Sequence, residues 1–334
     1  MKLPYGVFSH RVGKKLQFFN SSILQLYIMP LILPDQLPAI DELKQENIFT
    51  MGYKRADSQQ IRPLRLAVLN LMPLKITTET DFIRILSNSA LQIRVEFMKI
   101  KSHTSKNTPI EHMMAFYRNF EDMKKEKYDG LIVTGAPLEF INFEEVTYWE
   151  ELQKVFNWAH SHVTSTIYVC WAAFAGLYHF YGVPKYNTSN KIFGVFEHRM
   201  LSPELPIFRG FDDVFFAPHS RHCEVYHKDI EKVQGLHIIA ESDEAGVTIV
   251  EARNGREFFI TCHLEYSPLT LDSEYKRDIA KGKPINLPQN YYPKDDPTQM
   301  PIVRWRAAAN LLYTNWLNYY VYQETPFNID DIKE

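Results

Sequence analysis

The first half of the chain alternates between short apolar runs and segments with helical periodicity. The apolar runs are residues 64–70, 93–100, 128–134 and 166–170. Such runs, apolar almost throughout, are typical of strands that are buried on both faces of a parallel sheet. The segments with helical spacing between them are residues 78–89, 110–127 and 144–160. This alternation predicts an α/β fold with a mostly parallel central sheet flanked by helices.

The second half of the chain has a different pattern. Its apolar runs are closer together and comprise residues 214–217, 236–240, 248–252 and 258–263. Turn residues such as Arg253-Asn-Gly-Arg256 separate them, which favours hairpins, so we expect an antiparallel extension of the same sheet. Five prolines between Pro284 and Pro301 predict a long extended loop. Residues 303–322 have the pattern of an amphipathic helix that closes the fold.

The N-terminal segment differs from the rest of the chain. Four basic residues and no acidic residue precede Asp35. The apolar patch at residues 23–33 is interrupted by a glutamine and a proline, so it fits neither a secretory signal nor the ~20 apolar residues that a membrane span needs. We expect residues 1–28 to be a disordered extension or the product of an early start codon, with Met29 as the native start. Residues 29–334 are then expected to form a single domain.

Composition and charge exclude several classes of protein. Hydrophobic residues make up 45% of the chain, which is enough for a sizeable core. The net charge of -3 gives no electrostatic reason to expect nucleic acid or a membrane surface as a partner. Three cysteines (Cys170, Cys223 and Cys262) are too few and too scattered for a disulfide framework, so we expect a reducing, cytoplasmic compartment.

Cys170 is the first candidate for chemistry. It stands where the run at residues 166–170 meets an alanine-rich helical segment. A side chain at such a corner lies near a helix N-terminus, where the helix dipole and free N–H groups favour a thiolate. The N–H of Trp171 would then be placed to hold an oxyanion. A buried structural thiol is nevertheless the commoner explanation for a lone cysteine.

His263-Leu-Glu265 changes that balance. In open α/β sheets ligands collect at the carboxyl ends of strands, and both this motif and Cys170 follow predicted strands. If the chain is extended, His263 and Glu265 point the same way, and a carboxylate beside an imidazole supports a general base. The combination predicts a Cys-His-Glu triad. A third strand end, after residue 134, carries Gly135, Ala136 and Glu139.

A metal site is the rival interpretation of the same region. Five possible ligands occur in two clusters, namely His219, His222, Cys223, Cys262 and His263. Their spacing matches no common closed zinc pattern, and consecutive residues of a strand face opposite ways. We therefore predict no metal.

Several long motifs of the chain resemble one known family. They are Leu69-Asn-Leu-Met-Pro-Leu-Lys75, Val133-Thr-Gly-Ala-Pro-Leu-Glu139, Val169-Cys-Trp-Ala172, Gly210-Phe-Asp-Asp213, Ala217-Pro-His-Ser-Arg221 and Asn315-Trp-Leu-Asn-Tyr-Tyr-Val-Tyr322. In this order they resemble the homoserine O-acyltransferases of methionine biosynthesis, over about residues 29–329. The resemblance implies a fold similar to class I glutamine amidotransferases, acyl-CoA as a co-substrate without any other cofactor, and a homodimer.

The resemblance also implies roles for individual residues. Cys170 would be the nucleophile that accepts the acyl group, His263 the general base and Glu265 its partner, in a ping-pong transfer. Backbone N–H groups near Trp171, Gly135 and Ala136 would hold the oxyanion. Substrate contacts are implied at Lys191, Ser220 and Arg277. We assign Arg277 to the homoserine carboxylate, because a guanidinium binds a carboxylate bidentately.

Glu139 bears on the choice of acyl donor. In the family a glycine after Gly-Ala-Pro-Leu goes with succinyl transfer and a glutamate with acetyl transfer. A fixed carboxylate would also repel the terminal carboxylate of a succinyl group. We predict acetyl-CoA and L-homoserine as substrates. The alternatives are succinyl transfer, a glutamine amidohydrolase and a non-catalytic binding protein. The bulky Tyr168 near Cys170 and the lack of a synthetase module disfavour the amidohydrolase.

Overall fold

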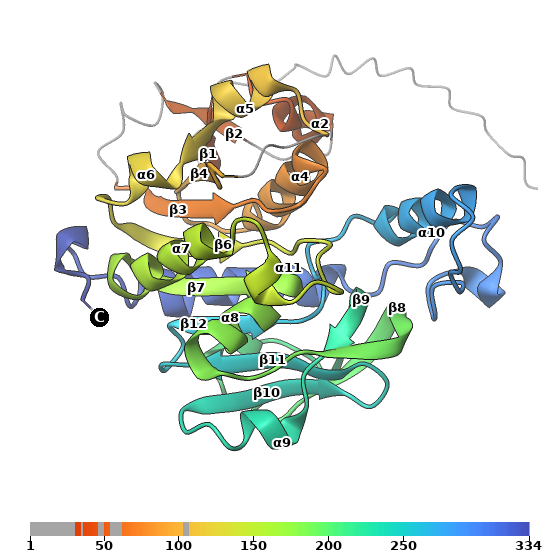
Figure 1. The fold of residues 1–334 in the computed structure, drawn as a ribbon. Helices are drawn as coiled ribbons and strands as arrows, with labels where there is room; N and C mark the ends of the chain where they lie inside the picture. The colour runs from red at the N-terminus through yellow and green to blue at the C-terminus, as the bar shows by residue number, and fades with distance from the viewer. Residues whose placement is uncertain (1–30, 35, 46–49, 54–61, 103–106, 334) are drawn as a thin grey trace, which may run out of the picture.

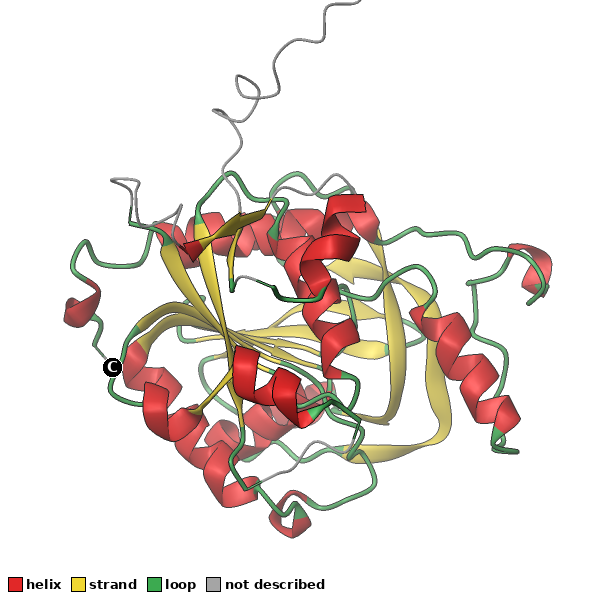
Figure 2. Cartoon of the chain, turned by 90° about the horizontal axis from the view of Figure 1, so that it is seen from above, coloured by secondary structure: helices red, strands yellow, loops and turns green. Residues whose placement is uncertain are grey.

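The structure is a computed structural model that describes residues 31–333 except 35, 46–49, 54–61 and 103–106. The extension predicted at residues 1–28 and the start predicted at Met29 lie outside the described residues. Within them, a single twisted sheet crosses the molecule, and helices lie on both of its faces (Figures 1 and 2).

The sheet has 12 strands in the order β2-β1-β4-β3-β6-β7-β12-β11-β10-β8-β9, with β5 paired to β4. Its parallel part comprises β1 (Leu31–Leu33), β2 (Thr50–Gly52), β3 (Leu64–Leu69), β4 (Ile93–Lys99), β5 (Tyr117–Asn119), β6 (Tyr128–Val133), β7 (Val163–Val169) and β12 (Glu257–Ile260). The antiparallel part comprises β8 (Tyr186–Met200), β9 (Val214–Glu224), β10 (Leu236–Ser242) and β11 (Gly246–Ala252). The predicted α/β fold with an antiparallel extension is thus confirmed.

Strand β12 is where the prediction needs correction. We expected residues 258–263 to belong to the antiparallel extension, but β12 runs parallel to β7 and antiparallel to β11. The hairpin predicted at residues 253–256 joins β11 to β12, with positive φ at Arg253, Asn254 and Gly255. That hairpin returns the chain to the centre of the sheet. Consequently the end of β12 lies beside the end of β7.

Two layers of helices cover the sheet. On one face, α2 (Ala39–Gln45) and α11 (Arg306–Asn315) pack against α4 (Lys75–Leu86). On the other face, α7 (Trp149–His162) and α8 (Trp171–Tyr181) pack against β7. The remaining helices are α5 (Ile110–Phe116), α6 (Phe120–Met123), α9 (His227–Ile230) and α10 (Thr270–Ala280). No helix in the described part of the chain is both long and apolar enough to cross a membrane.

The helix predicted over residues 110–127 is wrong as a single element. The chain forms α5, then the short strand β5, then α6. Tyr117 explains the interruption, because its backbone pairs with Phe97 of β4. Its buried phenol donates a hydrogen bond of 2.6 Å to Glu79. Tertiary contacts therefore override a helical pattern.

The C-terminal segment follows its prediction more closely. Residues 284–301 form an extended loop with one turn of 3-10 helix, η3 (Pro293–Asp295). Gln289 in this loop makes an isolated bridge to Gly194 of β8, so the loop is attached to that strand. The expected final helix begins at Arg306 and ends in a π-helical segment, η4 (Trp316–Tyr322). Trp316 is fully buried there and donates to Ser165 at 2.9 Å.

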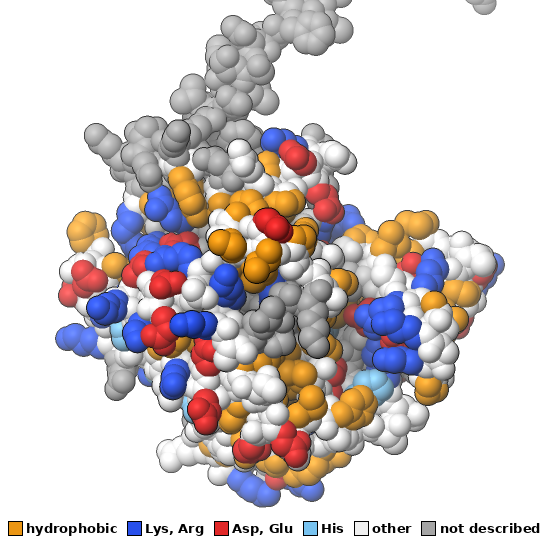
Figure 3. Space-filling view, turned by 45° about the horizontal axis from the view of Figure 1, so that its top comes forward, with side chains coloured by type: hydrophobic (Ala, Val, Ile, Leu, Met, Phe, Trp, Pro, Cys, Tyr) orange, Lys and Arg blue, Asp and Glu red, His pale blue; other side chains and the backbone are white. Residues whose placement is uncertain are grey.

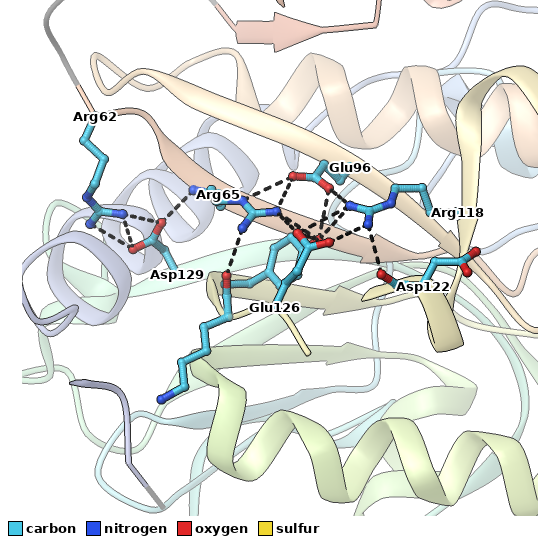
Figure 4. Close-up of polar contacts among 9 residues, drawn as sticks. Arg62, Arg65, Glu96, Arg118, Asp122, Glu126 and Asp129 are labelled. Carbon is cyan, nitrogen blue, oxygen red and sulfur yellow. Dashed lines mark hydrogen bonds and ion pairs between the residues drawn. The ribbon is translucent and has the colours of Figure 1, made fainter. Parts of the chain in front are cut away.

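A polar network links the parallel strands near their amino ends (Figure 4). Arg65 of β3 and Arg118 of β5 both donate to Glu96 and to Glu126, with Arg65 lying over the ring of Tyr128. Arg62 pairs with the fully buried Asp129 at 3.1 Å. These contacts join the starts of β3 and β6, away from the carboxyl ends of the strands.

Candidate active site

Cys170 occupies the sharp corner between β7 and α8. Its backbone has φ 50° and ψ -115°, a conformation that residues other than glycine rarely adopt. Such strain costs about 1–3 kcal/mol and is kept where a side chain must be displayed. The N–H of Cys170 donates to the carbonyl of Ile260 in β12 at 2.7 Å, which holds the corner in place. Trp171 is the first residue of α8 and is fully buried.

His263 and Glu265 lie directly after β12. The Nδ1 of His263 is 2.7 Å from Oε1 of Glu265, the contact that their spacing predicts. The backbone is not extended, however, because the N–H of Tyr266 donates to the carbonyl of His263 and closes a turn. A carboxylate can only accept, so Nδ1 carries the hydrogen and Nε2 is left for Cys170. The imidazole is stacked on the ring of Tyr266, with centroids 4.1 Å apart.

Electrostatics favour a charged imidazole. Burial acts to lower the pKa of His263, but the negative charges of Cys170 and Glu265, and hydrogen bonds to both, outweigh it. The pKa of His263 therefore lies well above its usual range. The charged imidazolium is therefore the form of His263 that these neighbours stabilise.

A cavity of about 290 Å³ opens above Cys170. Gly135 is part of its wall and approaches Cys170 closely, since a Cβ added at Gly135 would lie 3.3 Å from the Cβ of Cys170. Ala136, Met72 and Pro73 line the cavity as well. Each of these residues follows the end of a parallel strand, as ligand-binding residues in open α/β sheets commonly do.

Glu139 reaches the same cavity from the loop between β6 and the 3-10 helix η1 (Phe143–Glu145). Burial raises the pKa of its carboxyl, while the nearby charges of Lys191 and His263 act to lower it. Glu139 lies ahead of η1 rather than inside a helix. Glu139 lines the cavity together with Cys170, and its carboxyl group is close enough to Lys191 and His263 to interact with their charges.

Lys191 of β8 and Ser220 of β9 complete one wall and share a partner that the sequence analysis missed. Glu274 accepts hydrogen bonds from Lys191 at 3.2 Å and from Ser220 at 2.5 Å. Its other oxygen accepts from the hydroxyl of Tyr266 at 3.1 Å. Glu274 lies one helical turn before Arg277 on α10, a signal that appears only once residues 270–280 are known to be helical.

Arg277 also lines the cavity, with its guanidinium bound to Asp278. Nε and Nη2 donate to the two carboxylate oxygens of Asp278 at 2.9 and 3.0 Å. Lys283 and His222 lie nearby on the cavity wall. In Figure 3, Lys and Arg side chains gather beside a histidine on the side of the molecule that carries α10. An anionic group entering there would meet Arg277 at the rim.

The residues of the rival metal interpretation are engaged elsewhere. Nδ1 of His219 accepts from Arg221 at 3.2 Å, and its Nε2 lies 2.9 Å from Nε2 of His198. Burial lowers the pKa of His219 well below its usual range, so it stays neutral. His222 packs against Phe140 instead. Among the described residues, no group of three or more His, Cys, Asp or Glu side chains is arranged to hold a metal.

Solved structures that are similar to this one include a glutamine amidotransferase from Thermotoga maritima. It covers 78% of this chain and 100% of its own, with a TM-score of 0.52 and 12% sequence identity. At this identity the likeness concerns the fold alone. The fold is therefore of the glutamine amidotransferase-like α/β class.

Sequence comparison identifies the family. The model of the homoserine O-succinyltransferase family matches residues 30–327. A homoserine O-acetyltransferase from Bacteroides thetaiotaomicron is 65% identical over 305 residues, covering 91% of this chain and 100% of that protein. A homoserine O-acetyltransferase from Acetivibrio thermocellus is 54% identical with the same coverage. The chain belongs to the homoserine O-succinyltransferase family.

Proposed function

We propose that this protein transfers the acetyl group of acetyl-CoA to the hydroxyl of L-homoserine through an acyl-cysteine intermediate. The observation that carries the proposal is the joint position of Cys170, His263 and Glu139 around one cavity. Nucleophile, base and a donor-selecting carboxylate thus face the same reacting volume. The high identity to proteins named homoserine O-acetyltransferase supports the same activity.

The acylation step uses a thiolate–imidazolium pair. The Cys170 thiolate attacks the thioester carbonyl, and the backbone N–H groups of Trp171 and Ala136 are the proposed donors to the oxyanion. When the tetrahedral intermediate collapses, the C–S bond to coenzyme A breaks. His263 gives its proton to the departing coenzyme A thiolate. Acetyl-Cys170 and a neutral imidazole remain.

The deacylation step uses that neutral imidazole as a base. His263 takes the proton of the homoserine hydroxyl as its oxygen attacks the carbonyl of acetyl-Cys170. The C–S bond to Cys170 then breaks, which releases the O-acetyl ester and restores the thiolate and the imidazolium. Arg277 is the proposed partner of the homoserine carboxylate, and Glu274 is the proposed partner of its ammonium group. Lys191 and Ser220 hold Glu274 in position through their hydrogen bonds.

Glu139 is the proposed reason for acetyl over succinyl. A succinyl group would bring a second carboxylate into the small cavity beside Glu139, where burial strengthens repulsion between like charges. The methyl of an acetyl group meets no such penalty. Donor choice is therefore a matter of exclusion rather than of a better acetyl contact.

The test is to incubate the protein with acetyl-CoA alone and measure its intact mass. We expect one added acetyl group, mapped to the peptide that contains Cys170 and removed by L-homoserine. Cys170→Ala should acquire none, whereas Cys223→Ala, which removes another free buried thiol, should still be acetylated. If coenzyme A is not released and no adduct forms, the acyltransferase proposal is wrong.

Two further expectations stand as proposals. A cytoplasmic location agrees with the three free cysteines and with acetyl-CoA as a co-substrate. A homodimer is proposed from the family resemblance, and light scattering of the purified protein would measure it. A mass equal to one chain at assay concentrations would contradict the dimer.

A further inference from the structure

The loop that carries Glu139 is shaped by short local hydrogen bonds and by two side-chain contacts. Within it, Leu138 N–H donates to Ala136 at 2.9 Å and Ile141 N–H donates to Leu138 at 3.2 Å, so the loop makes tight local turns. Its tip is exposed, with Phe140 at 66%. Leu138 packs against the core and Phe140 packs against His222 of β9, so both neighbours of Glu139 are anchored. The backbone of Glu139 itself is held by one further contact.

Lys185 provides such a contact. Its Nζ donates to the backbone carbonyl of Glu139 at 2.5 Å and lies 5.4 Å from the centre of the Phe143 ring. Lys185 is half-buried, and no ion pair to a carboxylate is found for it in the described part of the chain. Its ammonium group thus binds the loop at the backbone of Glu139 and lies near the ring of Phe143 at the start of η1.

The end of α8 holds Lys185 in place. Gly182 ends the helix in the left-handed conformation, with φ 68°, and its N–H donates to Tyr178 at 2.9 Å. Val183 N–H then donates to Leu177, and the Val183 side chain is buried. Pro184 restricts the backbone just before Lys185. The helix that begins directly after Cys170 therefore leads, at its other end, to the contact with Glu139.

We propose that Lys185 is a positioning residue for donor selection: it holds the backbone of Glu139 so that the carboxylate stays in the cavity above Cys170. The inference rests on the proposed function of Glu139. Hydrogen bonds from an ammonium are stronger than those between neutral groups. Without this bond the loop can shift outward, and the carboxylate then no longer repels a longer donor.

The first experiment measures kcat/KM with acetyl-CoA and with succinyl-CoA for three variants. Lys185→Met keeps the aliphatic stem but removes the donor, and we expect the preference for acetyl-CoA to fall roughly tenfold. Lys185→Arg can still donate a hydrogen bond, so it should retain most of the preference for acetyl-CoA. Lys154→Met, on the exposed face of α7, should match the unmodified protein. An equal loss with both donors, or an unchanged ratio, would reject the proposal.

A double-mutant cycle separates this role from a general loss of structure. In a Glu139→Gly background, Lys185→Met should leave the donor ratio unaltered, because the carboxylate it positions is gone. A further change in ratio there would overturn the proposal. If Lys185→Met does not fold, Lys185→Leu, which also lacks a donor, replaces it, with the same outcomes. Failure of the unmodified protein to acetylate Cys170 would instead reject the proposed function itself.

Discussion

The parallel and antiparallel halves of the sheet supply the cavity in different ways. The parallel half does so through strand ends: Cys170 follows β7, Gly135 follows β6, and His263 follows β12. The antiparallel half does so through residues within strands, with Lys191 in β8 and Ser220 in β9. Parallel strands bring their carboxyl ends to one edge, whereas antiparallel strands do not. The parallel half therefore forms its part of the site through its topology. In the antiparallel half, Ser220 lies in regular register opposite Phe193, whereas Lys191 depends on a local deviation.

The deviation is visible in the pairing of β8 with β9. Asn187 pairs with Cys223, and the next paired residue of β8 is Ile192, opposite Arg221. Lys191 thus lies in an irregular stretch, and bulges of this kind re-aim a side chain. In our proposal the parallel half handles the acyl group, while the antiparallel half and α10 handle the acceptor. Half-reactions can test this division.

The largest effect is expected at the centre of the parallel half. Cys170→Ala should lower the overall rate at least ~10⁴-fold, because no other described group can accept the acyl group at this position. Coenzyme A release and product formation should disappear together. Retention of either one in a folded variant, checked by thermal melting, would show that the transfer does not pass through Cys170.

The next effect is expected at the strand that joins the two halves. Glu265→Gln should slow the reaction about 10³-fold, because a neutral amide no longer stabilises the imidazolium of His263. Rapid-quench measurement of coenzyme A release should show the loss already in acylation. Glu231→Gln is a matched control, since that side chain is 69% exposed and remote from the triad. Equal rates for the two variants would remove Glu265 from the catalytic mechanism.

The difference between the parallel and antiparallel halves also explains which site residues could be predicted from the sequence. The apolar runs and the strand-end rule identified Cys170, His263 and Glu265, because parallel sheets place chemistry at predictable positions. Neither rule applies to Lys191, which lies in an irregular stretch of a strand that was not predicted. Lys191 and Ser220 were named only through the family resemblance. Glu274 was not identified by the family resemblance either, since its role depends on how α10 packs against the sheet.

Arg277 tests the acceptor side. Arg277→Lys should raise the KM for homoserine roughly 10–100-fold, because the paired N–H groups of the guanidinium are lost. The rate of Cys170 acetylation by acetyl-CoA should stay within about twofold, since acylation precedes acceptor binding. Lys276→Met serves as control on the same helix, with a side chain that is 63% exposed. An equal loss in the rate of acylation would contradict the assignment of α10 to the acceptor alone.

The neighbouring carboxylate sharpens that test. Asp278 occupies the guanidinium of Arg277 bidentately and so competes with a substrate carboxylate. Asp278→Asn should therefore lower the KM for homoserine by a few-fold. A higher KM would instead mean that Asp278 holds Arg277 in its binding orientation.

The last effect concerns the charge on Glu139 and is a matter of pH. Burial raises the pKa of this carboxyl above its ordinary value of 4.5, so it takes up a proton at a higher pH than an exposed glutamate does. As the pH falls through that raised pKa, the repulsion of a succinyl carboxylate weakens. The ratio of succinyl-CoA to acetyl-CoA turnover should then rise, by about tenfold at full protonation.

The control for this prediction is Glu139→Gln, which carries no charge at any pH. Its donor ratio should be flat across the same range and equal to the low-pH limit of the unmodified protein. The ratio of the two turnover rates is independent of the protonation of His263, because His263 acts in the same way with both donors. A ratio that changes with pH equally in Glu139→Gln would assign the effect to another group. The charge that governs donor choice in the parallel-half cavity would then belong to a group other than Glu139.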